Sequence, residues 1–170
     1  QSVPDAKIIL YNFEKLCGYK FSVKCVENLA ARFPKNIIGV KDSSYNLMGN
    51  LNIKSFSILP GSELKLLNGL KKDCSGIITA TCNVTAKLAR KVFDDFEQNK
   101  EQTVNDKLCE VRKAFDQFNL ISGLHSFLSL TDKQFLNILP TCSLLNEKDG
   151  KILIDKLKDL DFLKKDFKAA

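Results

Sequence analysis

Residues 37–41, with the sequence Ile-Ile-Gly-Val-Lys, are a short apolar run that ends in a lysine. The run is rich in β-branched side chains and follows Pro34, which is typical of a strand buried on both faces of a parallel sheet. A lysine at the exit of such a strand lies beside a low-dielectric wall, where desolvation disfavours the charged ammonium. This makes Lys41 a candidate amine nucleophile toward carbonyl compounds. The same pattern also fits a strand that simply ends at a solvated lysine.

Strand-like and helical segments alternate around this run. Further apolar runs predict strands over residues 7–11, 56–59 and 76–79. Periodic apolar positions predict helices over residues 22–33, 46–51, 62–70 and 85–99. Ser22 and Ser62 are suitable N-caps for two of these helices. This alternation indicates right-handed βαβ units and a parallel sheet.

Beyond residue 100 the pattern is helical only, with helices predicted over residues 104–120, 132–139 and 147–163. A closed (β/α)8 barrel typically needs about 250 residues. Because the chain begins at Gln1 and reaches a strand by residue 7, we expect it to enter the fold midway. The predicted class is therefore α/β. Four β/α units, residues 1–99, form the second half of a (β/α)8 barrel, and residues 100–170 form a C-terminal helical extension.

The composition is that of an ordinary globular protein: 170 residues, 44% hydrophobic and 27% charged. The net charge of +6 does not indicate a nucleic-acid partner, because lysines and aspartates alternate along the tail. No apolar stretch approaches the roughly 20 residues of a membrane span, and no signal peptide is visible. The six cysteines form no CxxC pair, so we expect reduced thiols, a cytoplasmic protein and no zinc site. His125 is expected to pack rather than to act as a base, and no cofactor is expected.

Several segments share the sequence pattern of one family. They are Leu-Tyr-Asn at residues 10–12, Gly18, and Asn-Ile-Ile-Gly-Val-Lys-Asp-Ser-Ser at residues 36–44. Leu-Pro-Gly-Ser-Glu at residues 59–63 and Gly-Ile-Ile-Thr-Ala-Thr-Cys-Asn-Val at residues 76–84 follow at matching distances. Together they resemble the dihydrodipicolinate synthase / N-acetylneuraminate lyase family. The resemblance covers essentially the whole chain, but only the C-terminal part of the family.

The resemblance implies a (β/α)8 barrel that condenses or cleaves 2-keto acids through an enamine, with pyruvate and an aldehyde as partners. Lys41 would form a Schiff base with the ketone of pyruvate or of a pyruvate-derived substrate. Tyr11, at the end of the neighbouring strand, would carry protons to and from the aldol oxygen. Both residues lie at C-terminal strand ends, where barrels hold their active sites. The alternative for Tyr11 is an aromatic ring that packs at a strand end.

Four further residues are candidates for substrate binding. Gly61 would let the backbone approach a ligand closely, and Glu63 would bind substrate hydroxyls, as an acidic residue does there in the sugar-acid lyases. Ser62 belongs to the same turn, although Ser62 and Glu63 are equally explained as the N-cap and first turn of the next helix. Ile78 would line the pocket floor beside Lys41, or would be an ordinary core residue.

The chain departs from dihydrodipicolinate synthases after the tyrosine strand, where those enzymes have Pro-x-Arg-Thr-Gly. Here residues 14–18 read Glu-Lys-Leu-Cys-Gly, so Leu16 stands at the arginine position and cannot bind a carboxylate. Lys15 is adjacent, but would lie on another face of an extended segment. We therefore expect a 2-keto-3-deoxy sugar acid or sialic-acid-like substrate. The alternatives are dihydrodipicolinate synthase proper, and a non-catalytic member that binds keto acids or regulates another process.

The family's carboxylate cradle and second relay tyrosine belong to its N-terminal half, and nothing in these 170 residues replaces them. This predicts that the chain alone is inactive. The resemblance separately implies that the full-length protein is a homo-oligomer, either a dimer or a tetramer. A half-barrel that associates with a complementary chain is the remaining alternative.

Overall fold

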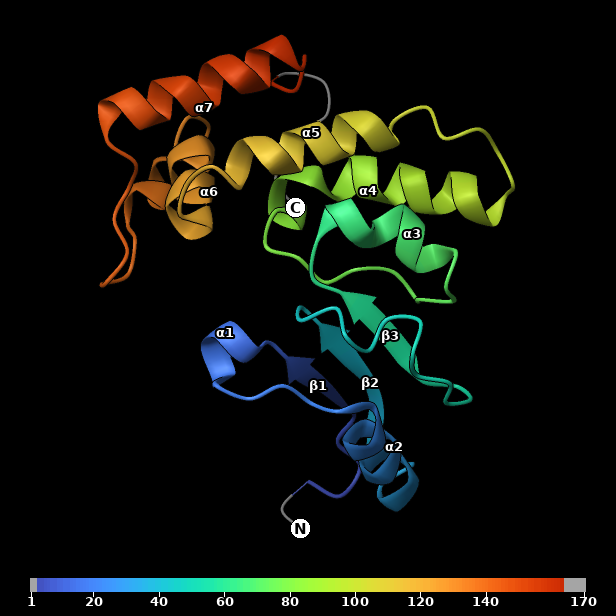
Figure 1. Ribbon diagram of the computed structural model, residues 1–170. Coiled ribbons are helices and arrows are strands. Elements are labelled where there is room, and N and C mark those ends of the chain that lie inside the picture. Colours follow the sequence, from blue (N-terminus) through green and yellow to red (C-terminus); the bar gives the residue numbers. More distant parts are fainter. Residues whose placement is uncertain (1–2, 164–170) are drawn as a thin grey trace. The chain divides into compact units, whose positions relative to one another are not determined.

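The computed structural model describes residues 3–163 (Figure 1). The chain divides into two compact units between residues 79 and 80. Residues 164–170 of the predicted helical extension lie outside the described residues. Over residues 3–163, every helix is too short or too polar to cross a membrane.

The first unit is built on a parallel sheet with the strand order β1 (Ile8–Asn12), β2 (Ile37–Asp42) and β3 (Ser57–Pro60). The strands predicted over residues 7–11, 37–41 and 56–59 are confirmed to within one residue. Lys41 lies between two register partners, Tyr11 on β1 and Leu59 on β3. The C-terminal ends of all three strands therefore meet at one edge of the sheet.

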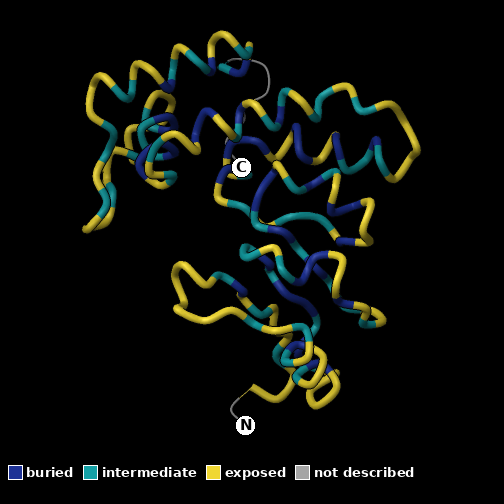
Figure 2. Tube along the Cα trace, in the orientation of Figure 1, coloured by how far each residue is buried: buried dark blue, intermediate teal, exposed yellow. Residues whose placement is uncertain are grey.

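The core of this unit lies on the face of the sheet that α2 (Val23–Arg32) covers. Val26 of α2, Val40 of β2 and Ile58 of β3 are buried in one apolar cluster, and Figure 2 shows β2 as mostly buried. The predicted cap of α2 is confirmed, since Ser22 Oγ accepts a hydrogen bond of 3.2 Å from the Cys25 N–H. This cap satisfies one of the N–H groups that a helix start leaves without a partner.

The predicted fourth strand over residues 76–79 is wrong: this segment runs beside β3 without forming a ladder. The Ser75 N–H donates to the Ile58 carbonyl at 3.0 Å, and the Ile78 N–H donates to the Pro60 carbonyl at 3.1 Å. The two carbonyl acceptors are two residues apart on β3, whereas the two N–H donors are three residues apart on the neighbouring segment. The register between the two segments therefore shifts by one residue. Pro60 has no N–H to donate in return, and Gly76 has a φ of 135°, far from strand geometry.

Two predicted helices of this unit also differ from the structure. Residues 46–51 form turns rather than a helix, because Gly49 has a φ of 78°, which a right-handed helix does not allow. The Asp42 carboxylate accepts the N–H groups of Leu47 and Met48 in these turns. Residues 62–70 form two short pieces, the 3-10 helix η1 (Glu63–Lys65) and α3 (Leu66–Leu70). Ser62 caps the first piece as predicted, with its Oγ accepting the Leu64 N–H at 3.3 Å.

The second unit is helical, and it includes the helix predicted over residues 85–99 as well as the segment beyond residue 100. Its elements are α4 (Cys82–Glu97), α5 (Asn105–Phe115), α6 (Leu120–Leu128), the 3-10 helix η2 (Lys133–Leu136) and α7 (Glu147–Asp159). Its core is aromatic: the Phe127 ring contacts Phe115 edge-on, with 5.8 Å between centroids, and stacks on Phe162 at 6.0 Å. All three rings are buried.

The helix boundaries of the second unit differ from prediction where side chains cap the backbone. The helix predicted over residues 104–120 ends at Phe115, and α6 begins separately because Asn119 Oδ1 accepts the N–H groups of Ile121 and Ser122. Thr85 does not begin α4. It lies buried in the first turn, and its hydroxyl donates to the Thr81 carbonyl at 3.0 Å. Residues 132–139 hold only η2.

Candidate functional site

Lys41 and Tyr11 meet on the face of the sheet opposite α2. Successive side chains of a strand point to opposite faces, and the buried Val40 and the partly buried Leu10 pack in the apolar cluster on the α2 side. Lys41 and Tyr11 are register partners on neighbouring strands, so they project from the same face. The Nζ of Lys41 lies over the Tyr11 ring, 4.2 Å from its centroid. Cation–π contacts act within about 6 Å, so the amine and the ring are in direct contact.

Both side chains are accessible to a ligand. Tyr11 is 39% exposed and Lys41 is half-buried. The sequence placed these two residues at neighbouring strand ends, and the structure brings them together there. Their catalytic roles stay predictions.

The packing of the loops that follow β2 and β3 requires a glycine at position 61. A Cβ at Gly61 would lie 2.2 Å from Ser43 Oγ, so the hydroxyl of Ser43 occupies the space that a side chain would need. The Gly61 N–H donates to the Asp42 carbonyl at 3.2 Å. Gly61 therefore joins the β2 and β3 loops, and its predicted approach to a ligand would be an additional role.

Glu63 is fully buried just beyond the C-terminal end of β3. Its Oε2 accepts a hydrogen bond of 3.0 Å from the Thr79 hydroxyl. Ile78, one residue before this threonine, is 39% exposed although its backbone is bound to β3. Ser62 is buried and acts as the cap described above. All four predicted substrate-binding residues thus follow β3 or lie beside it, at the edge where Lys41 emerges.

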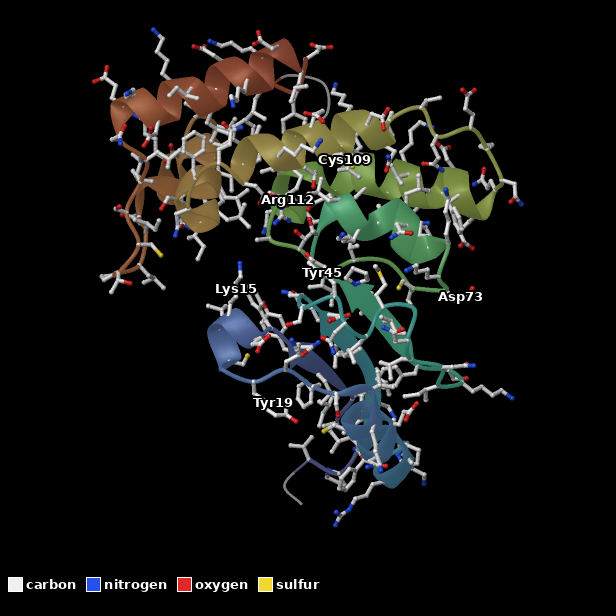
Figure 3. All side chains as sticks on the ribbon, in the orientation of Figure 1. Lys15, Tyr19, Tyr45, Asp73, Cys109 and Arg112 are labelled. Atoms are coloured by element: carbon white, nitrogen blue, oxygen red, sulfur yellow. The ribbon has the colours of Figure 1, made fainter. Side chains whose placement is uncertain are left out.

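The segment after Tyr11 is helical rather than extended. Residues Glu14–Cys17 form α1, which ends at Gly18 with a φ of 65°. Leu16, at the position where an arginine would bind a second carboxylate, is 75% exposed. Lys15, labelled in Figure 3, is exposed on the same short helix. The extended geometry assumed for Lys15 in the sequence analysis is therefore not the geometry of this segment.

Sequence reasoning missed a buried polar cluster at the strand ends. Asn12 and Asp42, which directly follow Tyr11 and Lys41, are both fully buried. Asn12 Nδ2 donates to Asp42 Oδ1 at 2.8 Å and to Asn46 Oδ1 at 2.8 Å. The available signal was the position of two polar residues at corresponding ends of apolar runs, since buried polar groups need partners.

The loop that carries Asn46 also contains Tyr45, labelled in Figure 3. Tyr45 has a φ of 58°, which is an uncommon conformation for a bulky residue. The Nζ of Lys65 lies 5.3 Å from the centroid of its ring. This loop is therefore held in a specific conformation close to the end of β2.

The buried thiol of Cys74 is unlike a catalytic nucleophile. All six cysteines are free thiols. Burial, together with the negative charge of Asp42, raises the pKa of Cys74 to about 11. A thiol with this pKa stays protonated and unreactive near neutral pH. Within residues 3–163, no group of three or more His, Cys, Asp or Glu side chains is placed to hold a metal ion.

His125 has a packing environment in the second unit. Its Nδ1 lies 2.9 Å from the Phe135 carbonyl, which can only accept, so Nδ1 carries the hydrogen. The imidazole also packs edge-on against the Phe135 ring, with 5.8 Å between centroids. These contacts agree with the expectation that His125 packs.

Comparison with known proteins places this geometry in a family. The model of the dihydrodipicolinate synthetase family matches residues 2–152. An uncharacterised DapA-like lyase of Chloroflexus aurantiacus is 28% identical over 132 residues, which are 75% of this chain and 44% of the relative. A probable 2-dehydro-3-deoxy-D-pentonate aldolase of Escherichia coli is 29% identical over 116 residues, which are 61% of this chain and 38% of the relative.

Solved structures show the same fold. A crystal structure of dihydrodipicolinate synthase from Thermotoga maritima has a TM-score of 0.82 at 19% identity, over 94% of this chain and 57% of that one. A prophage protein of Escherichia coli from the dihydrodipicolinic acid synthase family, solved with pyruvate, has a TM-score of 0.74 at 20% identity, over 92% and 56% of the two chains. This chain thus spans about half the length of its relatives. It belongs to the dihydrodipicolinate synthetase family.

Proposed function

We propose that this protein is a Schiff-base-forming aldolase or lyase that makes or breaks a carbon–carbon bond between pyruvate and an aldehyde. The observation that carries the proposal is the 4.2 Å contact between Lys41 Nζ and the Tyr11 ring. Family membership supports it, since relatives are named as a lyase and an aldolase. Family membership also supports the architecture expected from the sequence, which is half of a (β/α)8 barrel with a helical extension. In that architecture, the edge of the sheet where the strands end is the catalytic face.

In the proposed reaction, the neutral Lys41 amine adds to the ketone carbon of a 2-keto acid. The carbonyl oxygen leaves as water with one proton from the amine and one from the Tyr11 phenol, which leaves a protonated iminium and a phenolate. The iminium accepts the electron pair of the breaking C3–C4 bond, which leaves an enamine on the lysine. Tyr11 accepts the proton of the C4 hydroxyl as the aldehyde departs. Protonation of the enamine at C3 and hydrolysis then release pyruvate and the free amine.

The proposed substrate is a 2-keto-3-deoxy sugar acid or a sialic-acid-like compound. We propose that Glu63 binds substrate hydroxyls, because its bond to Thr79 holds the carboxylate in one orientation beyond β3. Gly61 and Ser62 would shape the same wall, and the exposed Ile78 would supply an apolar floor. The exposed Leu16 offers no donor for a second carboxylate, which argues against dihydrodipicolinate synthase as the main activity.

Borohydride trapping with pyruvate tests the proposal. Reduction of the Schiff base should attach the three-carbon acid to Lys41 in the complete natural polypeptide, as located by peptide mass spectrometry. Lys41→Arg keeps the charge but removes the primary amine, and should give no adduct. A folded wild-type protein without an adduct would rule the proposal out. A turnover assay should then favour 2-keto-3-deoxy acids over aspartate semialdehyde with pyruvate.

The second candidate is a non-catalytic protein that binds a keto acid. It is favoured by the departures at Glu14 and Leu16, which remove a binding group of the dihydrodipicolinate synthases. This candidate predicts that pyruvate raises the melting temperature, because a ligand that binds only the folded state stabilises it. It also predicts no turnover with any aldehyde, so the two functions are separated by the same samples.

A further inference from the structure

We propose that Asn12, Asp42 and Asn46 form a positioning network that fixes the Lys41 amine relative to the Tyr11 ring. The proposal rests on the proposed function, in which Lys41 forms the Schiff base and Tyr11 moves the proton. These three side chains, called the strand-end network below, touch neither the amine nor the phenol in the contacts described. Their role would be to hold the two strand ends that carry those groups.

Asn12 is the centre of the strand-end network. Its Nδ2 donates to Asp42 Oδ1 and to Asn46 Oδ1, both at 2.8 Å, and its Oδ1 accepts the Phe21 N–H at 2.9 Å. Asn46 returns to the same segment, since its Nδ2 donates to the Phe21 carbonyl at 2.8 Å. The network therefore joins the end of β1, the end of β2 and the segments that follow each strand.

Asp42 fixes the direction of every hydrogen bond in the network. It is fully buried, and a carboxylate only accepts. Its Oδ1 faces the amide of Asn12, and its Oδ2 faces the N–H groups of Leu47 at 2.9 Å and Met48 at 3.0 Å. All its partners are donors, so the Asn12 amide has one satisfied orientation. A buried donor left without a partner would cost about 1–3 kcal/mol.

The network is adjacent to the site through the backbone. Tyr11 pairs with Lys41 in the register, and the next pair is Asn12 with Asp42. Because side chains alternate across a strand, the network lies on the α2 face and the site on the other. The Ser43 N–H also donates to the Asn12 carbonyl at 2.9 Å. Any shift of the last pair would therefore move the amine against the ring, and a misplacement of about 1 Å can cost about 100-fold in rate.

The informative change is Asp42→Asn, which keeps the size of the side chain and reverses one hydrogen-bonding group. Whichever way the new amide turns, its NH2 faces a donor, either that of Asn12 or the two backbone N–H groups. The exchange variant Asn12→Asp/Asp42→Asn corrects this conflict. In it the amide at 42 donates to the carboxylate at 12, its oxygen accepts the Leu47 and Met48 N–H groups, and Phe21 keeps an acceptor. The carboxylate at 12 then faces the Asn46 oxygen, which accepted from the Asn12 amide, so the exchange restores the bond between positions 12 and 42 alone.

The test uses two readouts on the complete natural polypeptide. The first is the upfield ring-current shift of the Lys41 ε-CH2 protons by Tyr11, measured by NMR after selective lysine labelling. The second is turnover of a 2-keto-3-deoxy acid. Asp42→Asn should abolish the shift and lower kcat by about 10- to 100-fold, with KM changed less than about threefold. The exchange variant should recover part of the lost kcat, because it restores the bond between positions 12 and 42 but not the bond to Asn46. Asn52→Ala is the matched control, since this exposed asparagine between β2 and β3 makes none of the hydrogen bonds of the network.

Each result decides the proposal. If Asp42→Asn keeps both the shift and kcat, the network does not position the site. If Asp42→Asn fails to fold, Asn46→Ala replaces it, because this half-buried side chain lies at the edge of the network; an unchanged shift in Asn46→Ala would refute the proposal. Absence of a pyruvate adduct in the wild type would refute the proposed function alone, since the ring-current shift reports the geometry without catalysis.

Discussion

Gly61→Ala is expected to destabilise the first unit, because a side chain at this position would collide with Ser43. An ideal Cβ would lie 2.2 Å from Ser43 Oγ, 3.0 Å from its Cβ and 3.2 Å from its Cα. Ordinary contacts of a Cβ begin at 3.4 Å, so the hydroxyl would have to retreat by 1.2 Å, the difference between 3.4 and 2.2. The φ of Gly61 lies outside the left-handed region, so the cost is steric rather than conformational.

The size of the loss in the free energy of unfolding depends on which atoms around position 61 can move. The Ser43 hydroxyl can turn away, but the contacts at 3.0 and 3.2 Å still require a backbone shift of a few tenths of an ångström. Overpacking of this kind costs about 1–3 kcal/mol, and we expect a loss of about 1–2 kcal/mol in the free energy of unfolding. Ser43→Gly removes the two closest contacts. The double variant should therefore recover most of this loss, less about 0.5–1 kcal/mol for the added glycine.

Urea denaturation of the wild type, both single variants and the double variant measures these differences as shifts in midpoint at constant slope. A Gly61→Ala protein as stable as the wild type would refute the steric reasoning, and so would a double variant that recovers nothing. The same samples test the predicted ligand role of Gly61. If the backbone at 61 also approaches the substrate, the double variant regains stability and still turns over slowly.

Three further predictions concern single side chains. Thr79→Val removes the hydroxyl that donates to buried Glu63 and should lower the free energy of unfolding by about 1 kcal/mol in urea; an unchanged midpoint would contradict this. Burial and the charge of Asp42 raise the pKa of Cys74 to about 11 from an ordinary 9.0, so the folded state holds more protons between these values and stability should fall as pH rises from 9 to 11. Cys74→Ala should flatten that decline in a pH series of denaturation curves. Asn119→Ala removes the α6 cap and should cost about 1 kcal/mol, measured as a lower melting temperature, whereas an equal melting temperature would count against the cap.

The strands of the first unit could be predicted because their signal is local. A short β-branched run such as residues 37–41 favours a strand wherever it lies. Parallel pairing then follows from the helix between two strands, which places Tyr11 and Lys41 at the same edge. The contact of 4.2 Å between amine and ring could not be predicted from the sequence, because it depends on how the two strands are aligned with each other.

The errors lie where one residue overrides the structure that the apolar pattern around it favours. Residues 46–51 have a helical pattern, but Gly49 has a φ of 78° and turns the chain out of a right-handed helix. Residues 76–79 have a strand pattern, but β3 offers them Pro60, which has no N–H. In the second unit, the capping side chain of Asn119 begins a new helix inside a continuous apolar pattern. In each case a single residue decides the local structure, and the spacing of apolar residues does not reveal it.

The turn at residues 61–63 shows that a sequence motif can indicate where a site lies without indicating what each of its residues does. Gly61 is required by Ser43, Ser62 caps η1, and Glu63 accepts a bond from Thr79. Packing alone would therefore favour the same three residues whether or not a substrate ever contacts them. The side chains that packing leaves accessible to a substrate are those of Tyr11 and Lys41, on one face of the sheet, and of the neighbouring Ile78. The substrate is consequently expected to meet Lys41 and Tyr11 first, with Glu63 reached only by a hydroxyl that competes with Thr79.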